Sequence, residues 1–188
     1  MSSDRRPREA IGEHLLVLLC QVGDEAAFEE LFDRYNARIL YYLRRLVGTD
    51  GEAEDVMQEV WVKILRRIGT LREPRALCTW LYRIAHNQAV ERLRKQGREI
   101  SLEDLEEVPN GTEDIGALDR VDAAALHRAL DRTSPEHQAV LTLRFMNELS
   151  YQEIADVTGC SLGTVKSRLH FAKRALRAEI ERTNGGIR

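Results

Sequence analysis

Apolar residues recur every three or four positions through the first hundred residues, which is the period of an amphipathic helix. They form three stripes, the first ending at the turn signal Gly48 to Gly51 and the third beginning after Pro74. The stripes comprise Phe28, Leu31, Phe32, Tyr35, Ile39, Leu43 and Leu46; Val56, Met57, Val60, Trp61, Ile64, Leu65 and Ile68; and Leu77, Trp80, Leu81, Ile84, Ala85 and Leu93. Three helices that bury these stripes against one another predict a helical domain.

A second block of helical pattern occupies about residues 120–183. Its first predicted helix is Val121 to Asp131, and a second begins with Ser134 as cap and Pro135 at the first helical position. A third begins at Ser150, which with Glu153 forms the S-x-x-E pattern of a capping box. The block therefore predicts a second small helical domain.

The sequence LSYQEIADVTGCSLGTVKSRL predicts a short helix, a turn containing Gly159, and a second helix capped by Ser161. This is the layout of a helix-turn-helix, whose second helix enters the major groove of DNA. Leu162, Val165 and Leu169 are spaced three and four apart, so we expect them to face the core. The residues expected to face outward are Thr164, Lys166, Ser167, Arg168 and His170.

An acidic connector separates the two blocks. From Gly97 to Asp119 eight acidic residues oppose one basic residue, and Pro109, Asn110 and Gly111 interrupt the segment, which is typical of a tether. The predicted fold is all-α, with two small helical domains joined by an acidic flexible linker. The predicted division is an N-terminal, partly helical segment, 1–21; a first domain, 22–96; the linker, 97–118; a second domain, 119–183; and a tail, 184–188.

Composition supports a helical protein and gives no sign of a catalytic site. Hydrophobic residues make up 43% of the 188 residues, and 12 Gly and 4 Pro interrupt the chain. The longest apolar run, Leu15 to Cys20, is far too short to span a membrane, so we expect a cytoplasmic protein without membrane insertion. Cys20, Cys78 and Cys160 lie far apart, and no metal-ligand or phosphate-loop motif is present. We expect no metal, no cofactor and no enzymatic activity.

Positive charge is concentrated in two places although the net charge is −3. Ser161 to Arg182 contains six Lys or Arg and two Glu, and Arg83 to Arg98 contains five Lys or Arg and one Glu. Such clusters suit a phosphate backbone. The alternative interpretation of the C-terminal cluster is a solvated helix face whose cations offset the helix dipole.

Several motifs in order resemble the bacterial RNA polymerase sigma factors of the extracytoplasmic function (ECF) type. GDEAAFEELFDRY, AEDVMQEVWVKI and TWLYRIAHNQAVERLRK resemble sigma region 2, and LDRTSPEHQAVLTLRFMNELSYQEIADVTGCSLGTVKSRLHFAKRAL resembles region 4. The resemblance covers about residues 22–95 and 118–181, and an acidic linker stands in place of region 3. It implies a transcription initiation factor that binds core RNA polymerase, recognises the minus-35 and minus-10 elements, promotes strand opening and is controlled by an anti-sigma factor.

The resemblance also implies a role for particular residues. Asp55, Gln58 and Glu59 match the segment that docks on the clamp helices of the polymerase β′ subunit, while region 4 implies contact with the β flap. Residues implied at the minus-10 element are Tyr82, Arg83, Asn87, Arg92 and Arg94. Residues implied at the minus-35 element are Thr164, Lys166, Ser167, Arg168, His170, Lys173 and Arg174.

Some features leave alternatives open. Phe171 stands where relatives commonly carry Arg, so it contacts a thymine methyl group or packs against the domain or a partner. Trp80 and Tyr82 are candidates for base stacking, although Trp80 lies on an apolar stripe. Cys78 lies beside the proposed minus-10 segment and is either a redox sensor or a buried thiol. A duplex-DNA regulator, a protein-interaction module and a helical enzyme are the rival functions.

Overall fold

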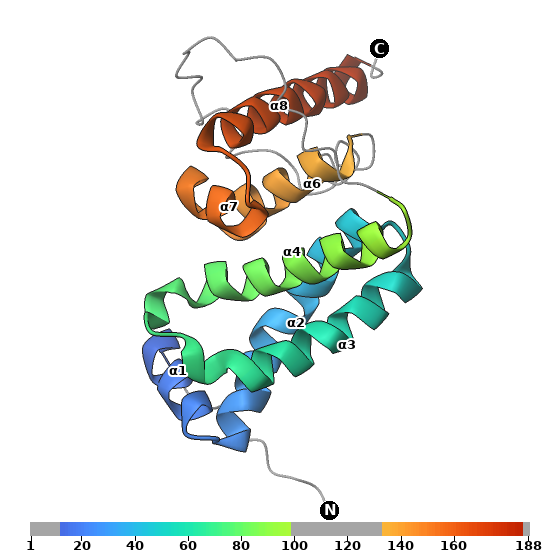
Figure 1. Cartoon of the computed structure of the whole chain (residues 1–188). Helices are drawn as coiled ribbons and strands as arrows, with labels where there is room; N and C mark the ends of the chain where they lie inside the picture. The colour runs from blue at the N-terminus through green and yellow to red at the C-terminus, as the bar shows by residue number, and fades with distance from the viewer. Residues whose placement is uncertain (1–11, 99–132, 186–188) are drawn as a thin grey trace, which may run out of the picture.

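The structure, a computed structural model, describes residues 12–98 and 133–185. The predicted helix Val121 to Asp131 and nearly all of the acidic linker lie outside these residues. Every regular element in the described ranges is helical, which confirms the expected all-α fold. The helices form a first bundle of α1 to α4 and a second bundle of α6 to α8 (Figure 1).

The first bundle consists of α1 (Glu13–Gln21), α2 (Glu25–Val47), α3 (Asp50–Arg67) and α4 (Leu77–Lys95). The three predicted stripes lie on α2, α3 and α4, which pack against one another. Two short 3₁₀ turns connect α3 to α4. Helix α1 packs on α2 and on these turns, so the first bundle has four helices where the stripes predicted three.

Side-chain caps and a left-handed glycine set the helix ends in the first bundle. The Asp24 carboxylate accepts a hydrogen bond from the Ala27 N–H at 2.8 Å, which satisfies a donor that has no partner within α2. Gly48 ends α2 with φ +93°, a conformation that a side chain disfavours. Thr49 then caps α3, which places the turn where the sequence predicts it.

Two residues expected in the core are exposed. Phe32 is 41% exposed and Leu65 is 59% exposed, so the expectation that both are buried is wrong. Their stripe neighbours Leu31 and Ile64 are buried. The stripes on α2 and α3 are wider than the contact between these helices, and the residues at the edge of each stripe remain in solvent.

The second bundle consists of α6 (Pro135–Leu141), a π-helical segment (Thr142–Met146), α7 (Tyr151–Thr158) and α8 (Leu162–Gly185). Helices α7 and α8 form the predicted helix-turn-helix, and the turn contains Gly159. Val165 and Leu169 of α8 are buried as expected. Leu162 is 39% exposed because it is the first residue of α8, so its expected place in the core is wrong.

The predicted caps of the helix-turn-helix are present. Ser150 and Glu153 form the capping box, in which the Ser150 hydroxyl accepts from the Glu153 N–H and the Glu153 carboxylate accepts from the Ser150 N–H. The Ser161 hydroxyl accepts from the Thr164 N–H at 3.0 Å. These bonds fix where α7 and α8 begin, and hence the angle of the motif.

Replacing Gly159 with alanine is expected to lower the free energy of unfolding by about 1 kcal/mol. Gly159 has φ +68° and nothing lies within 4 Å of the added Cβ, so the cost is conformational. Gly163→Ala is the matched control. Because Gly163 lies inside α8, where alanine is favoured over glycine by about 1 kcal/mol, this variant should not lose stability. Chemical denaturation measures both variants, and a stabilised Gly159→Ala protein would contradict the left-handed turn.

The two bundles lie directly against each other. Helix α7 packs on α4, and α6 packs on α2 (Figure 1). Helix α4 therefore has α2 and α3 on one side and α7 on the other. This packing decides which of the predicted binding residues reach solvent.

Candidate nucleic-acid interface

Helix α8 presents only part of its predicted DNA-binding face. Lys166 and Arg174 are exposed and His170 is half-buried. Thr164, Ser167, Arg168 and Lys173 are all buried, so the expectation that the first three face outward is wrong in this conformation. Their contact with DNA stays a prediction.

Arg168 lies buried at the boundary between the two bundles. Its side chain is 4% exposed and its guanidinium donates to the Cys160 Sγ at 3.1 Å. It borders a small pocket to which α4 contributes His86, Asn87 and Val90. A side chain that the sequence places on the outer face of α8 thus lies buried beside the contact between the two bundles.

Phe171 packs against the protein. Its ring lies 6.4 Å from that of His137 in α6 and 5.6 Å from that of His170, measured between centroids. Both pairs have the edge-to-face geometry that aromatic rings prefer. Of the two interpretations of Phe171, packing against the domain is the one that the structure supports.

Helix α4 carries an exposed polar stripe. Arg83, Asn87 and Arg94 are exposed, and their spacing of four and seven places them on one face. Arg92 is half-buried and forms an ion pair with Asp55 of α3 at 3.1 Å. The stripe combines a side chain that can bond two edges of a base with cations that suit phosphate.

Tyr82 does not join this stripe. It is 0% exposed, and its ring meets that of Tyr42 edge to face at 5.3 Å. Its hydroxyl donates to the Asn147 Oδ1 at 2.6 Å. The expectation that Tyr82 presents a stacking surface is therefore wrong for this conformation, because α7 and its preceding turn cover α4 here.

His86 is a buried titratable group at the same boundary. Its Nδ1 lies 2.9 Å from the Tyr42 hydroxyl, and it forms a hydrogen bond with the backbone of Thr158. Burial, assisted by the nearby Arg168 charge, lowers the pKa of His86 to about 4. The folded protein therefore holds this imidazole neutral at pH 7.

Acidification is expected to destabilise the protein through His86. Because its pKa is about 4 when folded and about 6.5 when unfolded, the unfolded chain binds more protons between these values, and stability is lost as the pH falls. The expected loss between pH 7 and pH 5 is about 2 kcal/mol. Denaturant titrations at both pH values check this. This loss of stability should be smaller in His86→Gln and unchanged in His14→Gln, which alters an exposed histidine as the control. Equal losses in the two variants would contradict the role of His86.

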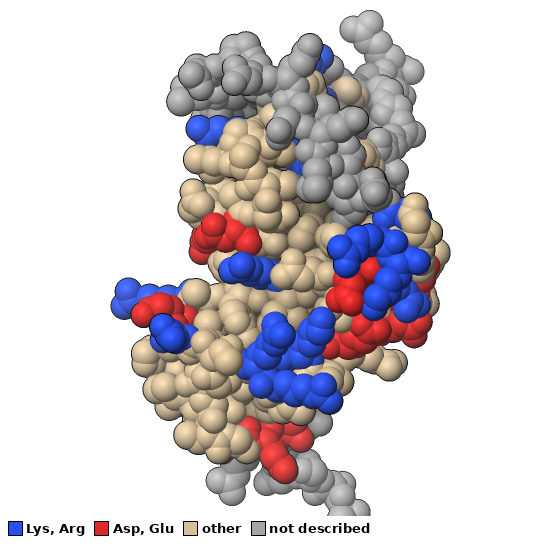
Figure 2. Space-filling view, in the orientation of Figure 1, with Lys and Arg blue, Asp and Glu red and all other residues tan. Residues whose placement is uncertain are grey.

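Helix α3 presents the predicted acidic group to solvent. Asp55, Gln58 and Glu59 are all exposed. The Glu59 carboxylate accepts from the Gln88 Nε2 at 2.7 Å, which connects the group to α4. Figure 2 shows acidic and basic side chains crowded together where α3 begins and α4 ends.

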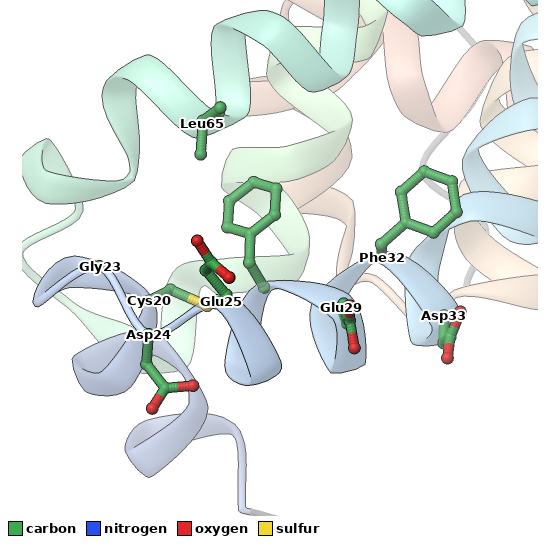
Figure 3. A pocket seen from close by; sticks show the side chains of 9 residues that line it. Cys20, Gly23, Asp24, Glu25, Glu29, Phe32, Asp33 and Leu65 are labelled. Carbon is green, nitrogen blue, oxygen red and sulfur yellow. The ribbon is translucent and has the colours of Figure 1, made fainter. Parts of the chain in front are cut away.

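Between α2 and the C-terminal part of α3 lies a pocket that the sequence did not reveal. Its volume is about 610 Å³, and Phe32 from α2 and Leu65 from α3 approach it from different helices (Figure 3). Trp61 supports it, since its ring lies 4.9 Å from that of Phe32 and 6.1 Å from that of Phe28. The acidic residues lining it are Asp24, Glu25, Glu29 and Asp33.

The apolar floor and acidic rim of this pocket suit a partner that carries apolar and basic side chains. The signal in the sequence was the run of acidic residues after Gly23, next to aromatic residues three and four positions apart. The pattern did not indicate that Phe32 and Leu65 remain uncovered.

The cysteines occupy ordinary packing positions. Cys20 is buried, while Cys78 and Cys160 are half-buried, and all three are free thiols. Burial raises the pKa of the Cys78 thiol to about 11. Among residues 12–98 and 133–185, no group of His, Cys, Asp and Glu could hold a metal ion. Within the same ranges no helix is both long and apolar enough to cross a bilayer.

Comparisons with known proteins agree on one family. Residues 31–99 match the family Sigma-70 region 2, and residues 123–176 match Sigma-70, region 4. The RNA polymerase sigma-H factor of Pseudomonas aeruginosa is 36% identical over 173 residues, covering 86% of this chain and 90% of that protein. The ECF RNA polymerase sigma-E factor of Escherichia coli K12 is 31% identical over 185 residues, covering 92% and 96%.

Solved structures share the fold. CnrH, in complex with the cytosolic domain of CnrY, matches with a TM-score of 0.60 and 20% identity, over 92% of this chain and 98% of that one. RpoE from Bartonella quintana, in complex with the anti-sigma factor NepR, matches with a TM-score of 0.60 and 21% identity, over 82% and 96%.

Proposed function

Since the chain belongs to the family of RNA polymerase sigma factors of the ECF type, we propose that its two bundles divide promoter recognition between them. Sigma factors are transcription initiation factors rather than enzymes, and they act by binding core RNA polymerase and promoter DNA. The second bundle binds the minus-35 element as duplex, and the first binds the minus-10 element and promotes strand opening. The protein acts in the cytoplasm and performs no catalysis, since nucleotide chemistry belongs to the polymerase.

The observation that carries this proposal is the helix-turn-helix of α7 and α8. The left-handed Gly159 and the Ser161 cap set the motif, and Lys166 is exposed in the second turn of α8. In this motif the N-terminal part of the second helix meets base edges. The minus-35 contacts proposed in addition are Thr164, Ser167, Arg168, His170, Lys173 and Arg174.

The exposed stripe on α4 supports the minus-10 role. Asn87 offers one donor and one acceptor to a base, while Arg83 and Arg94 offer cations to the backbone. Arg92 and Tyr82 belong to this proposed site only when the contacts that now hold them are released.

Asn87→Ala and Arg94→Ala are expected to separate base reading from phosphate binding. Loss of the Asn87 amide should relax preference at one minus-10 position, with a loss of about tenfold at the preferred base. Arg94→Ala should weaken binding to all promoters equally. It should also lower the slope of log affinity against log salt concentration by about 1. Open-complex formation on a promoter series at several salt concentrations measures both, and identical profiles for the two variants would contradict the assignment.

The acidic group on α3 and the pocket between α2 and α3 both support polymerase binding. Asp55, Gln58 and Glu59 provide charge, and Phe32 and Leu65 provide exposed apolar surface. We assign this surface to the β′ clamp helices and the second bundle to the β flap. A partner helix with apolar and basic residues would bury the apolar side chains and pair with the acidic rim.

The acidic linker, 97–118, is proposed to join two independently binding modules. Two weak sites on one chain gain affinity through effective concentration when both are engaged. The proposed domains are those predicted from the sequence, 22–96 and 119–183, with α1 packed on the first.

We also propose control by an anti-sigma factor, since RpoE of similar fold has been solved with one.

Run-off transcription with purified bacterial core polymerase and a genomic promoter library tests the function. Discrete start sites that share two spaced elements, and that require this protein, are the expected result. Binding to core polymerase without any start site would favour an accessory role. If the protein binds duplex DNA but not core polymerase, it is a duplex-DNA regulator instead.

A further inference from the structure

Helix α1 is attached to α2 and lies beside the loop that connects α3 to α4 (Figure 1). The match to the family Sigma-70 region 2 begins at residue 31, after α1 has ended. Leu16 and Val17 of α1 are buried, and the Tyr35 hydroxyl of α2 donates to the Glu13 carboxylate at 2.6 Å. A helix that is fixed to the bundle therefore borders the loop, and the family match assigns it no role.

Gln21, the last residue of α1, binds the backbone of this loop at two points. Its Nε2 donates to the Ile68 carbonyl at 3.1 Å and to the Leu71 carbonyl at 2.7 Å. The nitrogen of a glutamine amide carries two N–H donors, so these bonds use both of them. The side chains of Ile68 and Leu71 are buried as well. Residues 68–71 are thus attached to the first bundle through both backbone and side chains.

The loop has little regular structure of its own. It contains two 3₁₀ turns of three residues each, Ile68–Thr70 and Pro74–Ala76. The backbone hydrogen bonds of these turns join residues three positions apart, so they do not place the loop relative to the rest of the bundle. That placement comes from contacts with neighbouring elements, among them the two bonds from Gln21.

The attached residues lead directly into a cluster of exposed cations. The segment from Arg66 to Arg75 contains four Arg and one Glu, and all four Arg are exposed. The Leu71 carbonyl that accepts from Gln21 belongs to the peptide unit that joins Leu71 to Arg72. Because this unit is planar, a hydrogen bond to its oxygen restricts the direction in which the chain enters Arg72. The bond from Gln21 therefore acts on the position of Arg72.

We propose that Gln21 is a positioning residue for the minus-10 strand, which holds the loop so that the Arg72 guanidinium meets a phosphate of the unpaired DNA. The inference rests on the proposed function, which assigns the minus-10 element to the first bundle. Helix α4 begins at Leu77, six residues before Arg83, or about 9 Å along its axis. Arg72 and the exposed stripe on α4 thus serve neighbouring parts of one strand. A cation that is already in place loses less conformational entropy on binding than one on an unattached loop.

The first measurement tests whether Gln21 holds the loop in the full chain. Gln21→Leu removes both donors and keeps a side chain of similar size. Hydrogen exchange followed by mass spectrometry should become faster in residues 68–76 of this variant and stay unchanged in α2 and α3. Gln138→Leu is the matched control, because Gln138 is also half-buried and its Nε2 donates to the Thr133 carbonyl at 2.9 Å in the second bundle. It should leave exchange in residues 68–76 unchanged.

The second measurement tests the effect on DNA with holoenzyme reconstituted from the full chain and core polymerase. The probe is a fluorescein-labelled single strand that carries the minus-10 element of a promoter identified by run-off transcription. Gln21→Leu should bind it about fivefold more weakly, as for the loss of about one net hydrogen bond. The slope of log affinity against log salt concentration should fall by about 0.7, the value for one phosphate contact on a single strand.

A double variant tests whether Gln21 acts through Arg72. In protein that already carries Arg72→Ala, the Gln21→Leu substitution should change the affinity for the single strand by less than about twofold, because the cation that Gln21 positions is absent. Unchanged exchange in residues 68–76, or an equal effect of Gln21→Leu with and without Arg72, would overturn the inference.

Two further outcomes are distinguishable. If Gln21→Leu lowers the helical signal in circular dichroism, Gln21→Asn replaces it, because an amide that is one methylene shorter does not reach both carbonyls. Hydrogen exchange needs neither polymerase nor DNA. Failure of the original protein to bind core polymerase would refute the proposed function and the role of Arg72 with it, while the exchange result would still decide whether Gln21 holds the loop.

Discussion

Leu65→Arg is expected to weaken binding to core RNA polymerase by about 100-fold, as for a central interface residue. Leu65 is exposed beside the acidic pocket and borders it together with Phe32. An apolar partner group that packs on Leu65 would instead meet a charge, and a basic partner would be repelled. Because Leu65 already lies in solvent, the arginine can extend away from the core and the fold should persist.

Leu18→Arg is the control for this prediction. Leu18 is also an exposed leucine of the first bundle, but it does not line the pocket, so the variant carries the same added charge elsewhere. Fluorescence titration of labelled protein with core polymerase gives both affinities, and circular dichroism checks the fold. If both variants lose the same affinity for core polymerase, or if Leu65→Arg loses none, this pocket is not part of the polymerase-binding surface.

Lys166→Glu is expected to reduce transcription from promoters that depend on the minus-35 element by about 100-fold, since it removes one attraction and adds a repulsion. Lys166 is exposed on α8, near the helix N-terminus that we propose enters the groove. No packing contact needs to be broken for the substitution. The loss should therefore appear in DNA binding rather than in stability.

A promoter without the minus-35 element serves as the control for Lys166→Glu. On it the variant and the original protein should differ little, because the contact that the substitution removes is not made. Single-round transcription on both promoters measures the difference. An equal loss on both would mean that Lys166 acts through general charge or through polymerase binding.

The sequence predicted which kinds of residue form the candidate site, but it did not predict every residue that is exposed there. Asp55, Gln58 and Glu59 are exposed on α3 as expected, and Arg83 and Asn87 share an exposed face of α4. These positions lie opposite their apolar stripes, so the helical period alone places them outside. Residues at the edge of a stripe, such as Leu65, follow no such rule, because their exposure depends on how closely the neighbouring helix approaches.

The sequence by itself determined the local structure. Asp24, Thr49, Ser150 and Ser161 fix where helices begin, because each side chain accepts a backbone N–H that has no partner within its helix. Spacing of three and four residues determined which face of each helix is apolar. These signals involve residues within one or two turns of each other, so they can be recognised without knowledge of the tertiary structure.

Only the tertiary structure decided which polar residues are covered. Tyr82 and Asn147 are 65 positions apart, and Arg38 and Met146 are 108 apart, so neither pairing has a local signal. Arg168 likewise borders one pocket with His86 and Val90 of α4, and no local pattern indicates this. Periodicity assigns residues to a face of one helix, whereas the contact between two bundles depends on shape and hydrogen bonding over the whole surface. That contact decides that Tyr82, a candidate for promoter binding, lies buried between the bundles.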